Sequence, residues 1–570
     1  FVVATVAAFA PGLTGAFVWD DLTLVARDAN LRDLGSLGQI LGQPLWSGLP
    51  EFGGDPSLAP GHWRPLTSLT FAVGFALGGS AAHTLPFHLI SLALHLGASL
   101  VVFRILRRLV SSPWGAYVGA LAFALHTVHV ESVSWIAAVN DPLFGLFGLL
   151  SLNAWLAWRQ RGSGGLPLAS AAWLLLALGA KELAVAVPAM ILVVDLLLVS
   201  DRRRSLAGWG ALAASVAVWF GLRIAVFGEL TAGFLRGGAE TGPDGRGLML
   251  RVEMLGHGLV KLLFPVGLTP FRPFTEQGFS GWPLAQVAIA LVLFAVLLTL
   301  ALTKGWRTLG AALLLATAGL LPALIAVGAT GQTPYADRYV YLSVLGLSLG
   351  LAAVASLAPI QSASKSNGRA LRALLGPALL VIGLGFQTPL QAGIWQSQEQ
   401  LFRHGVEAQP DYPMVHWQLG EILRQRYLET GEEAAFHEAG ERYDRALDLL
   451  EAAKDDPSIP RGEYDYLQAN LGKAWWYLIE AEVDGYGEYD TAATIFEMLL
   501  GEVYKREEWN AQTGGTMASL PIEQVLTGLA ICQLSSGNRG QAMSNFMLAT
   551  TVNELYAPPW HNLGVMHFEA

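Results

Sequence analysis

Two adjacent carboxylates, Asp20 and Asp21, follow directly on an apolar run that begins at Phe1. Ionisable side chains are costly to place at a membrane boundary, and by default they indicate a functional site. A functional carboxylate in such a place can accept a proton from a substrate. The structural alternative is a polar stop at which a helix simply reaches water. This stretch alone favours neither interpretation.

Five further polar clusters interrupt the apolar sequence. They are Trp63-Arg64-Pro65-Leu66, the group His126, His129 and Glu131, the pair Asn140-Asp141, the pair Lys181-Glu182, and Asp337-Arg338-Tyr339. When such groups lie on one side of a membrane domain, a shared polar cavity is favoured over unrelated polar residues in separate loops. For two of the clusters a local ion pair is the alternative, either between Asp337 and Arg338 or between Lys181 and Glu182.

The spacing of His126, His129 and Glu131 would suit a metal ion if all three lay on one helix. The segment instead resembles the end of a membrane span, so we predict hydrogen-bonding roles for these side chains. No metal ion and no other cofactor is predicted.

The elements that must position these residues are membrane helices. Of the 570 residues, 53% are hydrophobic and 14% charged, and the mean hydropathy is +0.43, which indicates an integral membrane protein. The predicted fold is all-α, with about eleven spans of about 20 residues each. These spans lie near residues 1–17, 84–106, 114–135, 141–158, 166–180, 183–200, 206–227, 282–303, 308–327, 339–357 and 373–390.

Basic residues fall on alternate loops, which predicts the orientation. The clusters are Arg104, Arg107 and Arg108; Arg159 and Arg161; Arg202, Arg203 and Arg204; Lys304 and Arg307; and Lys365, Arg369 and Arg372. The positive-inside rule makes this side cytoplasmic. The carboxylate pair, the loops 18–83 and 228–281, and all residues after 391 then lie on the opposite, non-cytoplasmic side. We expect interfacial helices in the 18–83 loop and a membrane-lying helix over 248–264.

Residues 391–570 form a separate, water-soluble domain. They carry 28 acidic and 11 basic residues, so the acidic excess behind the net charge of −10 of the chain lies in this domain. The pattern Leu529-Ala530, Gly537, Ala542, Phe546 and Ala549 is typical of tetratricopeptide repeats, and Leu563-Gly564 follows one period later. Looser units begin near Leu419 and Leu471, and more repeats are expected beyond Ala570. Such arrays bind extended peptide or serve only as a scaffold; Trp417 and Trp560 are the candidate acceptor contacts.

The composition also excludes some classes of function. No basic face of the kind that binds nucleic acid is present. The single cysteine, Cys532, cannot form an internal disulfide. The first apolar run lacks a basic leader and a cleavage site, so it is not predicted to be a cleavable signal peptide. Because the sequence begins with Phe1, its N-terminus is expected to be incomplete.

Together these motifs resemble one family, the transmembrane O-mannosyltransferases with tetratricopeptide repeats that modify cadherins in animals. The resemblance rests on Phe17 to Asp21, Trp63 to Leu66, the His126 to Glu131 segment with Asn140-Asp141, Lys181-Glu182 and Asp337 to Leu342, in that order. The sequence departs from the family at Thr127 and at Ala138-Val139-Asn140. The family belongs to the multispanning lipid-linked-sugar glycosyltransferases of the GT-C type. Abundant Gly and Ala indicate a prokaryotic relative.

The resemblance implies transfer of a sugar, typically mannose, from a polyprenyl phosphate to Ser or Thr hydroxyls of secreted or membrane proteins, with inversion. A hydroxyl needs a carboxylate base, which Asp20 or Asp21 would supply, and the resemblance favours Asp20. Cations would stabilise the leaving phosphate, with Arg338 ranked before Arg64 and Lys181. The remaining donor contacts expected are Glu182, His126, His129, Glu131, Asn140, Asp141, Asp337 and Tyr339.

Two other functions remain open. The first is a ligase that moves sugars between lipid carriers, although a lipid acceptor has less use for a peptide groove. The second is a non-enzymatic membrane scaffold whose repeats recruit partners. A scaffold does not explain why so many ionisable residues lie on one face of the membrane domain.

Overall fold

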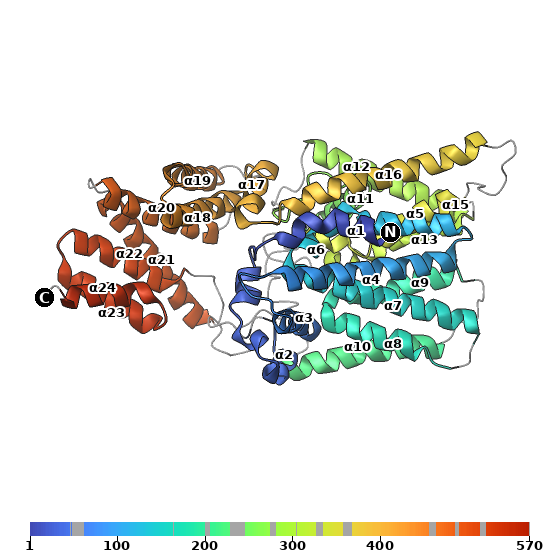
Figure 1. Cartoon of the computed structure of the whole chain (residues 1–570), viewed down its shortest axis with the longest axis horizontal. Coiled ribbons are helices and arrows are strands. Elements are labelled where there is room, and N and C mark those ends of the chain that lie inside the picture. Colours follow the sequence, from blue (N-terminus) through green and yellow to red (C-terminus); the bar gives the residue numbers. More distant parts are fainter. Residues whose placement is uncertain are drawn as a thin grey trace. The chain divides into compact units, whose positions relative to one another are not determined.

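The computed structural model describes residues 1–45, 47, 62–162, 165–199, 206–228, 246–273, 281–303, 305–325, 335–356, 367–454, 463–484, 489–513 and 520–568. Within these ranges the chain is helical, and its only β-pairing is an isolated bridge between Ser80 and His83. The predicted all-α class is therefore confirmed. The chain divides into two compact units, with the change between Leu401 and Phe402 (Figure 1). The predicted boundary lies after residue 390.

Three helical segments of the described residues are long and apolar enough to cross a membrane. They are Leu85–Leu109, Ile136–Arg161 and Leu206–Phe227, and the bent pair Ala378–Gly393 and Gln398–Ala408 is a fourth candidate, with 117° between its halves. Seven shorter apolar helices accompany them: Val2–Thr14, Pro65–Ala76, Pro113–Leu125, Leu168–Ala180, Val287–Thr303, Arg307–Ala318 and Val344–Ser356. Candidate membrane helices are thus present, while the number of eleven spans stays a prediction.

The first unit contains most of the apolar helices. Its longer helices are α3 (Pro65–Ala76), α4 (Leu85–Leu109), α5 (Pro113–Leu125), α7 (Asn140–Arg161), α8 (Leu168–Ala180), α9 (Ala186–Leu197), α10 (Leu206–Phe227), α11 (Arg246–Leu263), α12 (Gly281–Thr303), α13 (Arg307–Ala318), α15 (Val344–Ser356) and α16 (Asn367–Gly393). Short helices α1 (Val2–Phe9), α2 (Leu37–Gly42), α6 (Val130–Ser134) and α14 (Leu321–Ile325) lie between them. The predicted outer loops include residues 46, 48–61, 229–245 and 274–280, which lie outside the described residues.

Polar residues interrupt the apolar helices at two places, one inside a predicted span and one between two predicted spans. The span predicted over 114–135 ends as α5 at Leu125, and His126 has extended backbone angles. The 3-10 helix η6 (Thr127–His129), α6 and the 3-10 helix η7 (Ile136–Val139) follow before α7 begins. Lys181 is likewise extended between α8 and the 3-10 helix η8 (Glu182–Val185). The segment His126 to Glu131 is therefore no continuous helix, as predicted.

Close helix packing fixes the positions of these interruptions. Helices α4, α7 and α8 lie side by side with nearly parallel axes, and α10 packs on α8 (Figure 1). Helix α5 crosses α15 so closely that a Cβ atom on Gly119 would lie 2.4 Å from the carbonyl oxygen of Ser348. The glycine permits backbone contact between the two helices. The breaks after α5, before α7 and after α8 are thereby brought into one region.

The second unit is an array of helices. After α17 (Gln398–Ala408), which includes the change of unit, come α18 (Pro413–Thr430), α19 (Glu433–Ala452), α20 (Glu463–Asp484), α21 (Tyr489–Thr513), α22 (Ile522–Ser535), α23 (Arg539–Val552) and α24 (Ala557–Phe568). From α18 onward each helix packs on the next. The small residues of the predicted repeats, including Ala439, Ala492 and Ala542, are fully buried. Assignment of the array to the tetratricopeptide class stays a prediction.

Candidate active site

The Asp20-Asp21 pair lies in a tight turn, Val18–Asp21, which follows the first helix and its 3-10 extension η1 (Ala10–Thr14). The carbonyl oxygen of Val18 accepts the N–H of Asp21 at 3.0 Å. The N–H of Val18 in turn donates to Oδ2 of Asp21 at 3.0 Å. The other carboxylate oxygen, Oδ1, accepts the N–H of Ala137 at 2.6 Å. Asp21 is thus a buried group committed to backbone N–H donors.

Trp19 occupies the first central position of this turn with φ of +51°, the only positive φ of a non-glycine residue among those described. The left-handed conformation costs an L-residue about 1–2 kcal/mol. Its ring stacks on Trp135, with centroids 5.0 Å apart and planes 16° apart, and contacts Phe271 edge-on at 5.2 Å. Trp135 stacks further on Trp395 at 5.6 Å. These aromatic contacts offset the backbone strain at Trp19.

Asp20 occupies the second central position and differs from its neighbour. Its carboxylate accepts no hydrogen bond from the part of the chain that the structure describes, and the residue is half-buried. Burial raises the pKa of Asp20 to about 6, and the positive charge of Arg338 opposes this rise. Burial also raises the pKa of Asp21, although its backbone donors oppose the rise. The structure therefore distinguishes two carboxylates that are adjacent in sequence.

Arg338 belongs to the 3-10 helix η10 (Asp337–Val340) and pairs with Glu131 of α6. Its Nη1 donates to Oε1 of Glu131, and its backbone N–H donates to Oε2 at 3.1 Å. The guanidinium carbon lies 5.1 Å from the ring centre of Trp135 and 5.4 Å from that of Tyr339. Nε and Nη2 make no hydrogen bond to the described residues, and the side chain is 20% exposed. Arg338 thus keeps donors for a further anion.

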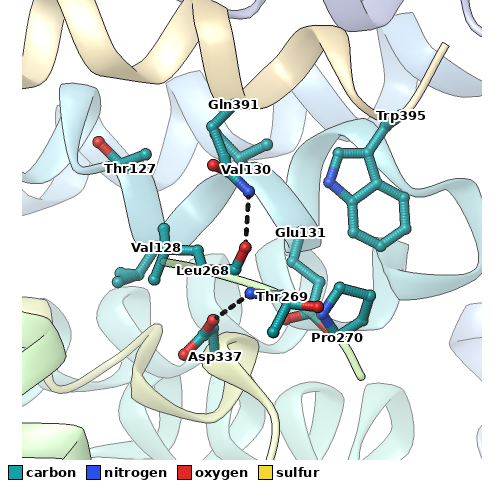
Figure 2. A pocket seen from close by; sticks show the side chains of 10 residues that line it. All are labelled: Thr127, Val128, Val130, Glu131, Leu268, Thr269, Pro270, Asp337, Gln391 and Trp395. Atoms are coloured by element: carbon teal, nitrogen blue, oxygen red, sulfur yellow. Dashed lines mark hydrogen bonds between the residues drawn. The ribbon is translucent and has the colours of Figure 1, made fainter. Parts of the chain in front are cut away.

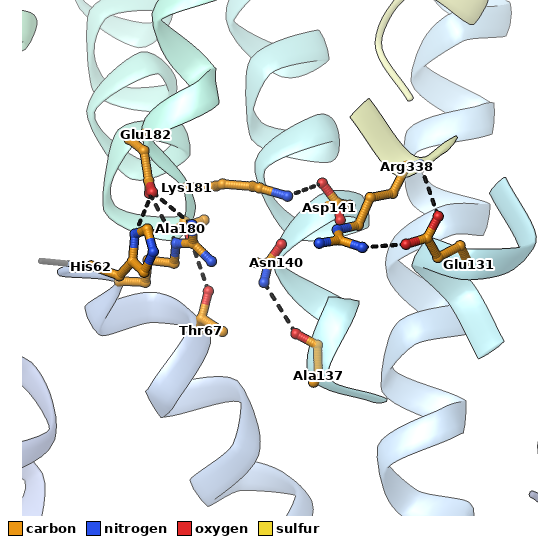
Figure 3. A network of polar contacts seen from close by, with 11 residues as sticks. His62, Thr67, Glu131, Ala137, Asn140, Asp141, Ala180, Lys181, Glu182 and Arg338 are labelled. Carbon is orange, nitrogen blue, oxygen red and sulfur yellow. Dashed lines mark hydrogen bonds and ion pairs between the residues drawn. The ribbon is translucent and has the colours of Figure 1, made fainter. Parts of the chain in front are cut away.

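Two more buried ion pairs continue from Arg338 across the site (Figure 3). Nζ of Lys181 donates to Oδ1 of Asp141 at 2.5 Å. Arg64 grips Glu182 through Nε at 2.9 Å and Nη2 at 2.6 Å, and Nδ1 of His62 lies 2.9 Å from the same carboxylate. Burial lowers the pKa of Lys181 to about 8; Asp141 opposes the change, and the charges of Arg64 and Arg338 add to it. The three cations therefore form one electrostatic cluster.

Some polar atoms in this cluster lack partners. Oδ2 of Asp141 and Oδ1 of Asn140 are fully buried and accept no hydrogen bond within the described residues. Nδ2 of Asn140 donates to the carbonyl oxygen of Ala137 at 3.1 Å. Buried acceptors without donors are energetically costly and uncommon. They point to a site that receives hydroxyl or amide donors from a ligand or from water.

The two predicted histidines lie deeper and serve the protein itself. Nε2 of His126 lies 3.0 Å from the carbonyl oxygen of Leu262, and Nε2 of His129 lies 3.3 Å from that of Tyr341. The ring of His129 also packs against His95, whose Nδ1 is 2.9 Å from the Tyr341 hydroxyl. Both histidines thus bond to backbone carbonyl groups of the protein, and the donor contacts expected of them stay a prediction.

A small hollow adjoins Glu131 and Trp395 (Figure 2). Asp337 lines it and accepts the N–H of Thr269 through Oδ2 at 3.1 Å. Gln391 of α16 donates to the carbonyl oxygen of Leu268 at 3.1 Å. The segment after α11 is thus held against η10 and α16.

The structure unites most of the residues selected from the sequence. Asp20, Asp21, Arg64, Glu131, Asn140, Asp141, Lys181, Glu182, Asp337, Arg338 and Tyr339 share one region of the first unit. The local ion pairs considered as alternatives, Lys181 with Glu182 and Asp337 with Arg338, do not form. Lys181 pairs with Asp141 instead, and Arg338 pairs with Glu131.

The two tryptophans of the helical array lie in the second unit and have different environments. Trp417 is buried, and its Nε1 donates to Asp465 at 3.0 Å. Trp560 is 53% exposed, and its Nε1 donates to the carbonyl oxygen of Glu554. Of the two, only Trp560 presents its ring at the surface of the described array.

Sequence reasoning missed the aromatic side chains of the site, Trp19, Trp135 and Trp395, and also His62. Trp19 and Trp135 each lie within four residues of a selected carboxylate, which is the signal that could have identified them. His62 directly precedes the selected cluster Trp63 to Leu66, which is a comparable signal. For Trp395, after the last predicted span, no such signal exists.

Fold and site together define a helical protein with candidate membrane spans and a buried cluster of carboxylates and cations at the helix interruptions. The chain is 33% identical over 195 residues to Protein O-mannosyl-transferase TMTC4 of Homo sapiens, an alignment that covers 31% of the chain and 25% of that protein. It is 32% identical over 171 residues to Protein O-mannosyl-transferase Tmtc2 of Drosophila melanogaster, covering 29% and 17%.

A third relative is Protein O-mannosyl-transferase Tmtc1 of Drosophila melanogaster, 30% identical over 148 residues, with 26% of the chain and 16% of the relative covered. The chain spans a quarter or less of the length of these curated relatives. No family model matches the chain. No solved structure matches it either.

Proposed function

We propose that this protein transfers mannose from a polyprenyl phosphate to Ser or Thr hydroxyls of exported proteins, with inversion at the sugar carbon. The observation that carries the proposal is the half-buried Asp20 carboxylate, which accepts no hydrogen bond from the described residues and lies near the charge of Arg338. The names of the relatives, all protein O-mannosyl-transferases, support the class of reaction.

In the proposed reaction Asp20 accepts the proton of the acceptor hydroxyl. The hydroxyl oxygen forms a bond to C1 of the mannose, while the bond from C1 to the phosphate oxygen breaks and its electron pair stays on the phosphate. Attack opposite the leaving group inverts the configuration at C1. A pKa of about 6 lets Asp20 be ionised at neutral pH yet basic enough to take the proton.

Arg338 stabilises the leaving polyprenyl phosphate. Nε and Nη2 are its donors not bonded to Glu131, and a guanidinium can donate to two phosphate oxygens at once. Lys181 and Arg64 are already paired with Asp141 and Glu182, so they contribute longer-range positive potential. The unpaired acceptors of Asn140 and Asp141 would receive hydroxyl groups of the sugar.

The proposal places this site on the non-cytoplasmic side of the membrane, following the basic loops of the sequence. Acceptor proteins would then reach it after export. The helical array after Leu401 would hold the acceptor segment.

The test is transfer by purified full-length protein in detergent. Mannosyl polyprenyl phosphate and a panel of exported proteins are supplied, and products are measured by intact mass. We expect mass increases in steps of one hexose on acceptors with Ser or Thr, and none on acceptors in which these residues are replaced by Ala. Transfer to added lipid acceptors without any transfer to protein would instead support the ligase function.

A further inference from the structure

We propose that Asp21 and Trp135 are positioning residues that hold the turn Val18–Asp21 so that Asp20 faces the acceptor. In calling Asp20 the base, this inference rests on the proposed function. The residue types alone do not separate Asp20 from Asp21. Within the described residues, the Asp21 carboxylate is bonded to backbone N–H groups and the Asp20 carboxylate is not.

Asp21 closes the turn in two ways. Its backbone N–H and its Oδ2 both bond to Val18, so the four residues form a ring with Asp20 near the tip. Its Oδ1 binds the N–H of Ala137, which lies 116 residues further along the chain. That bond fastens the turn to the segment that joins α6 to α7. The side chain of Asp21 is therefore occupied on both oxygens and is unsuited to accept a substrate proton.

Trp135 fixes the turn from the other side. The first central position of a turn with positive φ normally carries Gly, Asn or Asp, because other side chains are strained there. Trp19 occupies it at +51° and stacks on Trp135 with an interplanar angle of 16°. Trp135 also lies 5.1 Å beneath the guanidinium of Arg338. One indole ring thus links the turn that carries Asp20 to the cation proposed to bind phosphate.

The substitution Asp21→Asn separates positioning from proton transfer. An Asn side chain can still accept from Ala137, but its amide group is a donor and cannot accept from Val18. We expect kcat to fall by about 100-fold through misplacement of the base, with the KM for the donor unchanged because Arg338 is untouched. Hydrogen exchange at the amides of Val18 and Ala137 should accelerate in the variant. Asp33→Asn, in the same loop and exposed, is the matched control.

Trp135 provides the second pair of variants. Trp135→Phe keeps an aromatic face and should restore most of the kcat that Trp135→Leu loses. In Trp135→Leu the KM for the donor should also rise, since Arg338 loses the ring on which it lies. If Asp21→Asn does not fold, as judged by hydrogen exchange in α4 and α7 of the first unit, the Trp135 pair decides alone. Equal kcat for Trp135→Phe and Trp135→Leu would then overturn the inference.

The outcomes separate this inference from the proposed function. Wild-type kcat and exchange in Asp21→Asn would overturn the positioning role even if mannose transfer is observed. If neither the wild-type protein nor its variants transfer mannose, the proposed function fails. Faster hydrogen exchange at Val18 and Ala137 in Asp21→Asn would still support the positioning role of Asp21. Unchanged exchange at both amides would overturn it.

Discussion

Replacing Arg338 by Ala should weaken use of the lipid donor. The substitution removes two N–H donors, Nε and Nη2, that the described residues leave uncommitted. A hydrogen bond to a charged group contributes about 1.5–3 kcal/mol, so two such bonds contribute about 3–6 kcal/mol. At about 1.4 kcal/mol per tenfold, transfer should fall by about 10²- to 10⁴-fold. The assay is initial rate against donor concentration at saturating acceptor.

The substitution also leaves Glu131 buried without its cation. Breaking a buried pair costs about 3–5 kcal/mol, and the 20% exposure of Arg338 places this one near the lower end. The double variant Glu131→Gln with Arg338→Ala removes the stranded charge and should regain thermal stability without regaining transfer. Recovery of transfer to near the wild-type rate in the double variant would refute a phosphate contact by Arg338.

A matched control tests the loss of an ion pair by itself. Arg159 pairs with Asp195 at 2.8 Å, and both side chains are buried. Arg159 and Asp141 lie near opposite ends of α7, about 27 Å apart along the helix axis at 1.5 Å per residue. Arg159→Ala should therefore lower thermal stability while transfer by the folded protein stays near the wild-type rate.

Two further predictions concern protonation and the helical array. The transfer rate should rise with pH through about 6, because Asp20 ionises there. The rate should fall above about pH 8, because Lys181 then loses the charge that balances Asp141. A rate profile that is flat from about pH 5 to 9, rather than bell-shaped, would contradict both assignments. In the array, a Cβ on Gly528 would lie 2.2 Å from the ring of Phe496, so Gly528→Val should destabilise the second unit by several kcal/mol in denaturant unfolding. Gly501 in α21 is the control, because a Cβ added there would have no neighbour within 4 Å. Gly501→Ala should therefore leave stability unchanged or raise it. Equal changes in stability for Gly528→Val and Gly501→Ala would contradict the packing around Gly528.

The sequence was sufficient to predict that the polar clusters lie in one region, because burying an ionisable group in apolar surroundings is unfavourable unless it is paired with another polar group. It was insufficient to predict how they pair. Lys181 and Glu182 are neighbours in the chain, yet the extended backbone at Lys181 sends the two side chains to different partners, Asp141 and Arg64. Pairing of this kind depends on local backbone direction, which composition and spacing do not encode.

The helix interruptions explain the other difference from expectation. Hydropathy extended the predicted span 114–135 beyond Leu125, where α5 ends, because it averages over residues and does not detect one His with extended backbone. The same averaging cannot distinguish Asp20 from Asp21. Their difference arises from a hydrogen bond to Ala137 and from the stack of Trp19 on Trp135, both contacts between segments more than 110 residues apart.

The most direct test of the account is mannose transfer by Asp20→Asn, compared with Asp33→Asn and measured by intact mass. Asp33 is exposed, and among the described residues its side chain accepts a hydrogen bond from the N–H of Gly35, which an Asn side chain can also accept. The account predicts a loss of about 10²- to 10⁴-fold for Asp20→Asn with retained donor binding, and a wild-type rate for Asp33→Asn. A wild-type rate for folded Asp20→Asn would contradict its role as the base.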